Sequence, residues 1–202
     1  MTAQGDTAAI VLAAGAASRF GAAKLVVLLD GEPLVRRAAC AARAATSVVA
    51  VVTGAHREGV AAAIARLDVI VAHNTHWQSG LGSSIACGLR ALLAQSTRLR
   101  RVAILLADQA LLGAVDLARL LSEHDESPDS IVAAGYDGTC GAPCVFPQAY
   151  FAQLCQLRAA NGARALLKRH AQNVRVVPLA RAAVDIDTQA DYAALIGDST
   201  RN

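Results

Sequence analysis

Short apolar runs alternate along this chain with longer segments in which apolar residues recur at helical spacing. The run 47–52, Ser-Val-Val-Ala-Val-Val, contains no charged residue. Continuous apolar runs of this length are typical of strands buried on both faces, as in a parallel sheet covered by helices. We therefore predict strands at 8–13, 48–53, 69–72, 102–106, 131–134 and 174–177.

The segments between these strands are rich in alanine and leucine and predict helices. Pro33 suits the first turn of one of them, because proline has no backbone N–H to leave unpaired there. The expected helices span 33–45, 58–66, 83–94, 115–123, 149–157 and 163–170. This alternation predicts an α/β fold, a three-layer α/β/α sandwich with a mostly parallel sheet.

The alternation of strands and helices is interrupted after the predicted strand at 131–134. Residues 135–139 are turn-rich, and an apolar segment follows at 143–147. We interpret the pair as a hairpin at an edge of the sheet. Such a hairpin either contacts a second substrate or only closes the edge, and the residues alone leave both possibilities open.

Composition favours a single domain. The 202 residues are 54% hydrophobic but only 3% aromatic, which predicts a core of alanine, valine and leucine. The sequence has no long linker, repeat or low-complexity tract. We expect one domain over 1–197 and a frayed end at 198–202.

Charge and cysteine usage exclude several classes of partner. The net charge is +3 and the arginines are scattered rather than gathered in a stripe, so nucleic acid is not an expected partner. The five cysteines are expected to be free thiols in a reducing cytoplasm, and Cys140 and Cys144 lack a matching pair for zinc. We see no secretory leader and no apolar run of membrane-spanning length. A cytoplasmic protein without a membrane partner is expected.

The segment 10–24 has the most informative chemistry. An apolar strand ends in Ala13, Ala14 and Gly15, and Arg19 and Lys24 follow. Tiny residues let backbone N–H groups approach a ligand closely, and arginine and lysine suit phosphate oxygens. The mononucleotide P-loop and the Gly-x-Gly-x-x-Gly pattern are both absent. A polyphosphate cradle is the favoured interpretation, and a plain strand–turn–helix with two solvated cations is the alternative.

Three later segments add polar groups where ligands of open α/β sheets bind. Asp108 and Gln109 follow the strand at 102–106, and the carboxylate can bind Mg²⁺ or cap the next segment. Residues 80–84 open a helix, which they can cap or expose to a ligand. Asp185 and Asp187 share one face of an extended segment, either as ligands or as acids flanking a helix cap at Thr188.

Together these motifs resemble those of one enzyme family. Leu-Ala-Ala-Gly-x-x-Ser-Arg-Phe-Gly-x-x-Lys at 12–24 is similar to the signature loop of nucleotidyltransferases in the glycosyltransferase-A-like superfamily. The match is closest to the MobA-like branch, which contains molybdenum cofactor cytidylyltransferases and guanylyltransferases. It covers 10–192 in the expected order and implies a nucleotide-diphospho-sugar transferase-like (Rossmann-like) fold. Two stretches depart from the family's pattern: 107–110 has Ala-Asp-Gln-Ala for Gly-Asp-Gln-Pro, and 140–143 has Cys-Gly-Ala-Pro for Arg-Gly-His-Pro or Arg-Gly-Asn-Pro.

The resemblance implies roles for individual residues. Arg19, Lys24 and Asp108 would be catalytic, and Asp108 and Asp187 would hold Mg²⁺. Residues contacting the nucleotide would be Leu12, Ala13, Ala14, Gly15, Gly80, Leu81, Gly82, Ser83, Ser84 and Gln109. Residues contacting the acceptor would be Gly141, Pro143 and Arg164, the last of which can equally be a surface charge at a helix start.

The implied reaction moves CMP from CTP to the phosphate of molybdopterin, with release of pyrophosphate. Leu-Ala-Ala-Gly and Gly-Leu-Gly-Ser-Ser favour cytidylyl transfer, since guanylyl-transferring relatives more often show Leu-Ala-Gly-Gly. Alternatives are guanylyl transfer from GTP, a sugar-phosphate acceptor, or a non-catalytic protein that binds the molybdenum cofactor and delivers it. An apo-molybdoenzyme or its chaperone would then be a further partner.

Overall fold

A seven-stranded sheet forms the centre of the computed structural model, which describes residues 6–20, 23–158 and 162–199. Its strand order is β5-β4-β1-β6-β8-β7-β9. The strands are β1 (Thr7–Ala13), β4 (Val48–Thr53), β5 (Ile70–His73), β6 (Arg101–Leu106), β7 (Ile131–Tyr136), β8 (Thr139–Pro147) and β9 (Val174–Pro178). All neighbouring strands run parallel except that β8 is antiparallel to β6 and β7. The predicted mostly parallel sheet is therefore confirmed.

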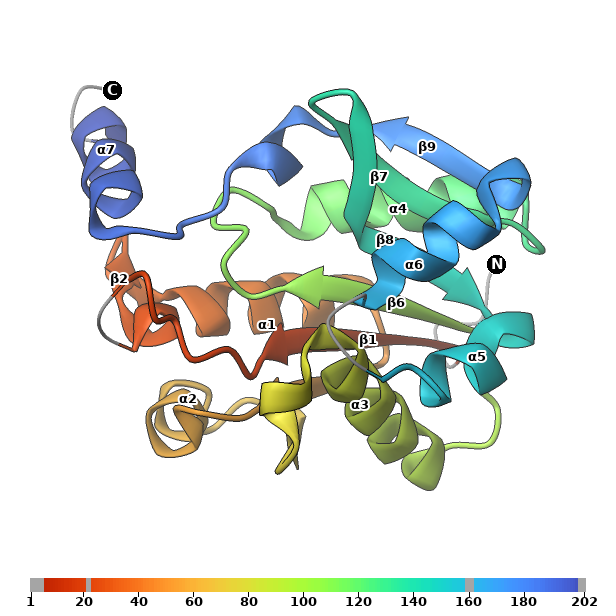
Figure 1. Ribbon diagram of the computed structural model, residues 1–202, viewed down its shortest axis with the longest axis horizontal. Helices are drawn as coiled ribbons and strands as arrows, with labels where there is room; N and C mark the ends of the chain where they lie inside the picture. The colour runs from red at the N-terminus through yellow and green to blue at the C-terminus, as the bar shows by residue number, and fades with distance from the viewer. Residues whose placement is uncertain (1–5, 21–22, 159–161, 200–202) are drawn as a thin grey trace.

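Helices cover both faces of this sheet, as Figure 1 shows, with α3, α5 and α6 in front and α1 and α4 behind. The helices are α1 (Leu34–Ala45), α2 (Arg57–Ala63), α3 (Leu81–Gln95), α4 (Ala114–Glu126), α5 (Phe151–Cys155), α6 (Gly162–Arg169) and α7 (Gln189–Ser199). The three-layer α/β/α architecture follows from this arrangement.

The two core layers explain why the strands are apolar without interruption. Successive side chains of a strand point to opposite faces of the sheet. In β1, Val11 packs in the layer under α1, α2 and α4, whereas Ile10 packs in the layer under α3, α5 and α6. Every residue of β1 is buried, so alternation between apolar and polar residues would have placed polar groups in one of the two layers.

The predicted hairpin exists, but its predicted place at a sheet edge is wrong. Strands β7 and β8 pair antiparallel, and β8 inserts between β7 and β6 inside the sheet. The edges are β5 and β9 instead. Pro143 is tolerated in this interior strand because the pairing of β8 with β7 shifts register beside it, where a ladder hydrogen bond is not required.

Element ends also differ from the predictions at several places. Pro33 precedes α1 rather than lying in its first turn, and it pairs within a short hairpin of β2 (Leu28–Leu29) and β3 (Glu32–Pro33). The predicted helix at 149–157 is shorter, because a 3₁₀ turn precedes α5. Helix α7 continues to Ser199, into the predicted frayed end, and 200–202 lie outside the described residues.

A small third core ties the beginning of the chain to its end. Phe20, Leu29, Leu34 and Ile186 are buried together, with Tyr192 of α7 packed against them. The rings of Phe20 and Tyr192 meet edge-on at 6.2 Å, and the Tyr192 hydroxyl donates a hydrogen bond to the Leu28 carbonyl at 2.6 Å. These contacts place α7 beside β2 (Figure 1) and bring the segment after Ile186 to the first loop.

The cysteines and the helices show two further properties. All five cysteines are free thiols, as the sequence predicts. Within the described ranges, no helix has the length and apolar character needed to cross a membrane.

Burial of His124 in α4 predicts a loss of stability in acid. Desolvation, followed by the positive charge of Arg101, lowers the pKa of His124 to about 4, while Asp125 and Asp129 act in the opposite direction. The unfolded chain binds this proton near the ordinary pKa of 6.5, so the stabilising effect is complete above pH 6.5 and is lost as the pH falls toward 4. Urea denaturation should show a fall of roughly 1–3 kcal/mol in the free energy of unfolding from this residue alone.

The control for this acid effect is the His124→Gln chain, which has no titrating group at this position. Its free energy of unfolding should depend less on pH between 4 and 6.5. An identical pH dependence in both chains would show that His124 is not the group responsible.

Candidate functional site

The loop after β1 is held against the loop after β4 by close backbone contact. The Ala55 N–H donates to the Ala14 carbonyl at 3.2 Å. A Cβ on Gly54 would stand 2.4 Å from that same carbonyl oxygen, so this position requires glycine. One ring nitrogen of His56 lies 3.0 Å from the Ala16 carbonyl. These contacts fix the loop while Gly15 stays exposed at its surface.

The rest of this loop turns sharply. Ala17 has φ of +51°, a conformation that costs a non-glycine residue free energy of order 1 kcal/mol or more. The Phe20 N–H closes the turn by donating to the Ala17 carbonyl at 3.0 Å. Arg19 projects from the turn with its side chain 73% exposed. The turn therefore presents an exposed cation beside a fixed stretch of backbone.

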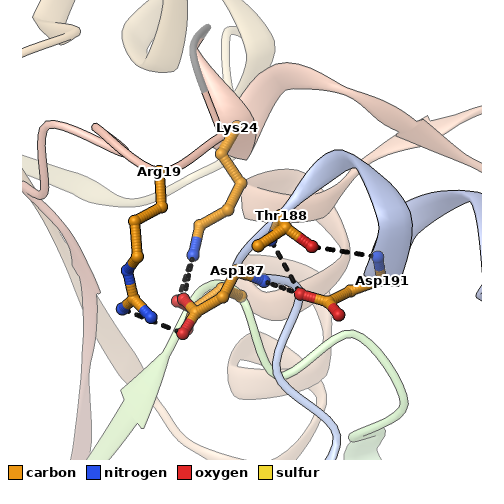
Figure 2. A network of polar contacts seen from close by, with 6 residues as sticks. Arg19, Lys24, Asp187, Thr188 and Asp191 are labelled. Carbon is orange, nitrogen blue, oxygen red and sulfur yellow. Dashed lines mark hydrogen bonds and ion pairs between the residues drawn. The ribbon is translucent and has the colours of Figure 1, made fainter.

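One lysine and two aspartates from distant segments meet next to this turn, where Arg19 joins them. The Lys24 ammonium lies 2.7 Å from Asp108 Oδ2 and 3.2 Å from Asp187 Oδ1. Arg19 contacts the other oxygen of Asp187 at 2.9 Å. Figure 2 shows Arg19 and Lys24 approaching Asp187 from the same side. The Lys24 side chain is only 9% exposed, so this is a partly buried network rather than a surface ion pair.

Asp187 is held in place by the start of α7. The Asp191 carboxylate accepts hydrogen bonds from the Asp187 and Thr188 N–H groups at 3.0 and 2.7 Å. The Thr188 hydroxyl in turn accepts one from the Asp191 N–H at 3.2 Å (Figure 2). This is the reciprocal capping arrangement that the sequence predicts for Thr188. The hydrogen bonds lower the pKa of Asp191, which keeps its carboxylate charged.

A cavity of about 340 Å³ opens over this network. One side is the loop from Ala14 to Arg19, and another is the start of α3 at Gly80, Leu81 and Ser84. Buried Asn74 organises that start, because its amide donates to the Ser83 and Ser84 hydroxyls at 2.9 and 3.0 Å. The cavity therefore joins the predicted phosphate loop to the predicted base contact.

A second cavity of about 830 Å³ adjoins the first and shares Leu12, Arg19, Leu81, Leu106 and Asp187 with it. Its other polar groups are Tyr136, Arg164, Lys168 and Asp185. Burial raises the pKa of Tyr136, although the charge and hydrogen bonding of Arg164 oppose this. The two cavities form one cleft along the carboxyl ends of β1 and β6.

Asp185 adds a third acidic group to the cleft. As a residue it is exposed, but its carboxyl faces the second cavity. Desolvation, and then the negative charges of Asp108 and Asp187, raise its pKa to about 6, while Lys24 and Arg164 act in the opposite direction. The cleft thus contains three carboxyl groups, two of which pair with Lys24, and it has further basic groups, Arg164 and Lys168, in the second cavity.

Most of the residues predicted for the site line this cleft. The first cavity contains the predicted catalytic and metal residues and most of the predicted nucleotide contacts: Leu12, Ala14, Gly15, Arg19, Lys24, Gly80, Leu81, Ser84, Asp108 and Asp187. Gly141 and Arg164 line the second. Among the described residues, the structure does not place Ala13, Gly82, Ser83, Gln109 or Pro143 in the lining of either cavity.

The Gln109 side chain holds backbone segments together and does not line the first cavity. Its amide nitrogen donates to the carbonyls of Ala142 and Ala182, both at 2.9 Å, and the residue is 4% exposed. Its amide oxygen is buried without a hydrogen-bond partner among the described residues. Gln109 therefore joins the loop after β6 to β8 and to the segment before Asp185.

Several lining residues were not predicted from the sequence. Trp77 and Gln78 line the first cavity beside Gly80, and Tyr136 and Lys168 line the second. A signal for Trp77 is present in the sequence, because it is the chain's single tryptophan and lies three residues before Gly80. Tyr136 and Lys168 gave no such signal, since each enters the cleft only through the sheet and helix packing.

The donor set fits a divalent cation that is shared with a ligand. The described residues contain no cluster of three or more His, Cys, Asp or Glu side chains suited to a metal. Asp108 and Asp187 converge on one cation, the Lys24 ammonium. Two carboxylates, with phosphate oxygens and water completing the shell, are what Mg²⁺ commonly uses in nucleotide sites.

Comparison with known proteins identifies the family. Residues 9–174 match the family model of the MobA-like NTP transferase domain. The chain belongs to this family. Its nucleotidyltransferase character agrees with the resemblance seen in the signature loop, and the family indicates an enzyme. No curated protein sequence matches the chain.

Several solved structures share the fold of this MobA-like chain. Rv0371c from Mycobacterium tuberculosis H37Rv superposes with a TM-score of 0.78 at 24% identity, covering 98% of this chain and 100% of that one. It has also been solved as a manganese complex. A nucleotidyl transferase from Methanothermobacter gives 0.78 at 21% identity, covering 96% and 98%. CMP:2-keto-3-deoxy-manno-octonic acid synthetase in complex with CTP gives 0.72 at 13% identity, covering 96% and 98%. At these identities the similarity shows the fold alone.

Gly15→Ala should weaken nucleotide binding without harming the fold. A Cβ at Gly15 meets nothing within 4 Å, so the methyl group fits the unliganded chain. It would then stand where the loop backbone has to approach phosphate oxygens. We expect the dissociation constant for Mg²⁺–CTP to rise at least about tenfold by isothermal titration, with the melting temperature unchanged.

The matched control for Gly15→Ala is Gly59→Ala in α2, where the added methyl makes ordinary contact with Val26 at 3.6 Å. This variant should bind the nucleotide like the parent chain. Unchanged affinity in the Gly15→Ala chain would show that the loop backbone does not approach the phosphates.

Proposed function

We propose that this chain is a divalent-metal-dependent nucleotidyltransferase that moves CMP from CTP to the terminal phosphate of molybdopterin and releases pyrophosphate. The observation that carries the proposal is the convergence of the loop from Gly15 to Arg19 with Lys24, Asp108 and Asp187 in one cavity. The adjoining second cavity, with Arg164 and Lys168, leaves room for an anionic acceptor.

In the proposed reaction an oxygen of the acceptor phosphate attacks the α-phosphorus of CTP. The bond from the α-phosphorus to the bridging oxygen breaks, and that oxygen leaves with pyrophosphate. Such displacements depend mainly on positioning and charge neutralisation, and no protein nucleophile is required. A divalent cation held by Asp108 and Asp187 would supply charge neutralisation at the phosphates. The fold brings both carboxylates to the carboxyl end of β6, beside the phosphate loop.

Three basic side chains, Arg19, Lys24 and Arg164, would bind the phosphate groups of the two substrates. The exposed Arg19 side chain can reach phosphates that lie along the turn from Gly15 to Ala17. Lys24 is buried at the junction of the phosphate loop and the carboxylates, where charge develops at the α-phosphate. A residue so placed stabilises the transition state more than the bound substrate. Arg164, at the start of α6, would hold the acceptor's phosphate on the other side.

The choice of CTP rests on the sequence of the first loop, Leu12-Ala13-Ala14-Gly15, and on that of the Gly80–Ser84 turn. Both segments border the first cavity, where Leu12, Ala14 and Gly80 stand among its lining residues. A neighbour in fold has been solved with CTP bound. Cytosine is therefore the base we expect at the α3 end of the cavity.

A ligand panel tests this proposal. Melting temperatures are measured with CTP, GTP, UTP and ATP, each with Mg²⁺, because a ligand at a hundred times its dissociation constant stabilises by about 2.7 kcal/mol. CTP should raise the melting temperature most, and molybdopterin should add a further rise. A preference for GTP would replace cytidylyl by guanylyl transfer, and no rise with any nucleotide would reject the proposal.

A further inference from the structure

We propose that Lys24 occupies the position of the divalent cation until a nucleotide arrives, so that metal and nucleotide bind this chain cooperatively. The inference rests on the proposed function, because it concerns the same carboxylates. It adds an order of events: the metal binds weakly by itself and tightly together with the triphosphate.

The contacts of Lys24 carry the first step of the argument. Its ammonium reaches both Asp108 and Asp187, at 2.7 and 3.2 Å, with a side chain only 9% exposed. A buried ammonium needs paired charges, since it has lost most of its contact with water. The two carboxylates likewise need a cation between them, because two negative charges that contact the same ammonium repel each other. Lys24 therefore meets the need of both groups in the unliganded chain.

A metal ion arriving alone would find this arrangement unfavourable. It would have to displace Lys24, and removing one member of a partly buried ion pair leaves the other unpaired at substantial cost. Arg19 also contacts Asp187, at its second oxygen, and competes for it. Asp185 lies in the same cleft, but within the described residues it does not complete a group of three His, Cys, Asp or Glu side chains that could hold a metal and offset this cost.

A bound triphosphate would make metal binding at the two carboxylates favourable. The cavity that contains Lys24, Asp108 and Asp187 also contains the loop from Gly15 to Arg19, so phosphate oxygens would lie within reach of the Lys24 and Arg19 side chains. The two cations then exchange carboxylate partners for phosphate partners, and the carboxylates become available to the metal. Each ligand thus lowers the cost of binding the other, which is a positive coupling free energy between them.

The type of residue at position 24 agrees with this exchange. Lys24 and Lys168 are the only lysines in a sequence whose other basic residues, apart from histidine, are all arginine. Lysine is a compact point charge on a flexible stem, whereas arginine favours a fixed two-pronged contact with one carboxylate. A group that must move between carboxylate and phosphate oxygens suits lysine.

The test measures Mn²⁺ binding by electron paramagnetic resonance, with and without the non-hydrolysable analogue α,β-methylene-CTP. The parent chain should bind Mn²⁺ weakly alone and much more tightly with the analogue. Lys24→Met should tighten binding of Mn²⁺ alone by about tenfold or more, because it removes the competing charge. Lys24→Arg should stay weak. Arg98→Met removes a positive charge at an exposed position that lines neither cavity, and it should leave the Mn²⁺ affinity within twofold.

A measurement on the unmutated chain covers the case in which Lys24→Met does not fold. With ¹³C-lysine labelling, only two lysines contribute ε-methylene signals, and the Lys168→Met spectrum assigns them. Mg²⁺ alone should leave the Lys24 signal in place, whereas Mg²⁺ with the analogue should shift it. A shift caused by low-millimolar Mg²⁺ alone, or an unchanged Mn²⁺ affinity in a folded Lys24→Met chain, would overturn the inference. Failure of the parent chain to bind Mn²⁺ even with the analogue would instead reject the proposed function.

Discussion

Asp108→Asn should lower the rate of nucleotidyl transfer by at least about a hundredfold while the fold stays intact. Asparagine keeps the shape of the side chain but removes the charge that would hold a divalent cation between the strand end and Asp187. The melting temperature should change little, because the asparagine side-chain oxygen can still accept the hydrogen bond that the Lys24 ammonium donates to Asp108. Lys24 also keeps its contact with Asp187 in this variant.

The matched control for this prediction is Asp68→Asn. The Asp68 side chain is 98% exposed, and its ion pair with Arg43 is long, at 3.8 Å. This variant should retain the parent rate and the parent melting temperature. An Asp108→Asn chain that turns over within a few-fold of the parent would remove Asp108 from the metal site.

Gln109→Leu should lower the free energy of unfolding by roughly 2–4 kcal/mol, as urea denaturation would measure. The change removes both hydrogen bonds from the Gln109 amide and leaves the carbonyls of Ala142 and Ala182 without these donors. An unsatisfied buried polar group costs roughly 1–3 kcal/mol. The loss is partly offset, because the unpartnered amide oxygen of Gln109 disappears too. The affinity for Mg²⁺–CTP should change little, because Gln109 does not line the first cavity.

Gln95→Leu, at an exposed position near the end of α3, is the control and should stay within about 0.5 kcal/mol of the parent. The two roles considered for Gln109 give opposite results. If Gln109 contacts the nucleotide, Gln109→Leu weakens nucleotide binding and leaves the stability nearly unchanged. That outcome would contradict the structural role described above.

The fold could be predicted from the sequence wherever hydrophobic pattern alone decides it. The runs at 8–13, 48–53 and 102–106 are apolar on both faces, and each is a central strand. The place of β8 could not be predicted in this way. Its turn-rich start indicates a hairpin, but whether the second strand pairs outward or inserts beside β6 depends on long-range packing. No local pattern around Pro143 distinguishes these two arrangements.

The candidate site could likewise be predicted only in part: its motif residues could be found from the sequence, but their contacts with one another could not. Arg19, Lys24 and Asp108 could be found because each belongs to a recognisable motif that comes after a strand. Their mutual pairing could not, because Lys24 and Asp187 are far apart in the sequence. Long-range contacts bring them together, among them the small core around Phe20 and Tyr192 and the hydrogen bond from the Ile186 N–H to the Asp108 carbonyl. For the same reason a motif position such as Gln109 can match the family and still face two backbone carbonyls rather than the cleft.

Release of pyrophosphate tests the central claim most directly. The purified chain is incubated with CTP, Mg²⁺ and molybdopterin, and free pyrophosphate is measured over time beside the Asp108→Asn chain. The account predicts one pyrophosphate for each CMP joined to molybdopterin, with no release when Mg²⁺ is omitted and almost none from the variant. Binding of both substrates without pyrophosphate release, from CTP or from GTP, would contradict it and would favour a protein that only binds and delivers the cofactor.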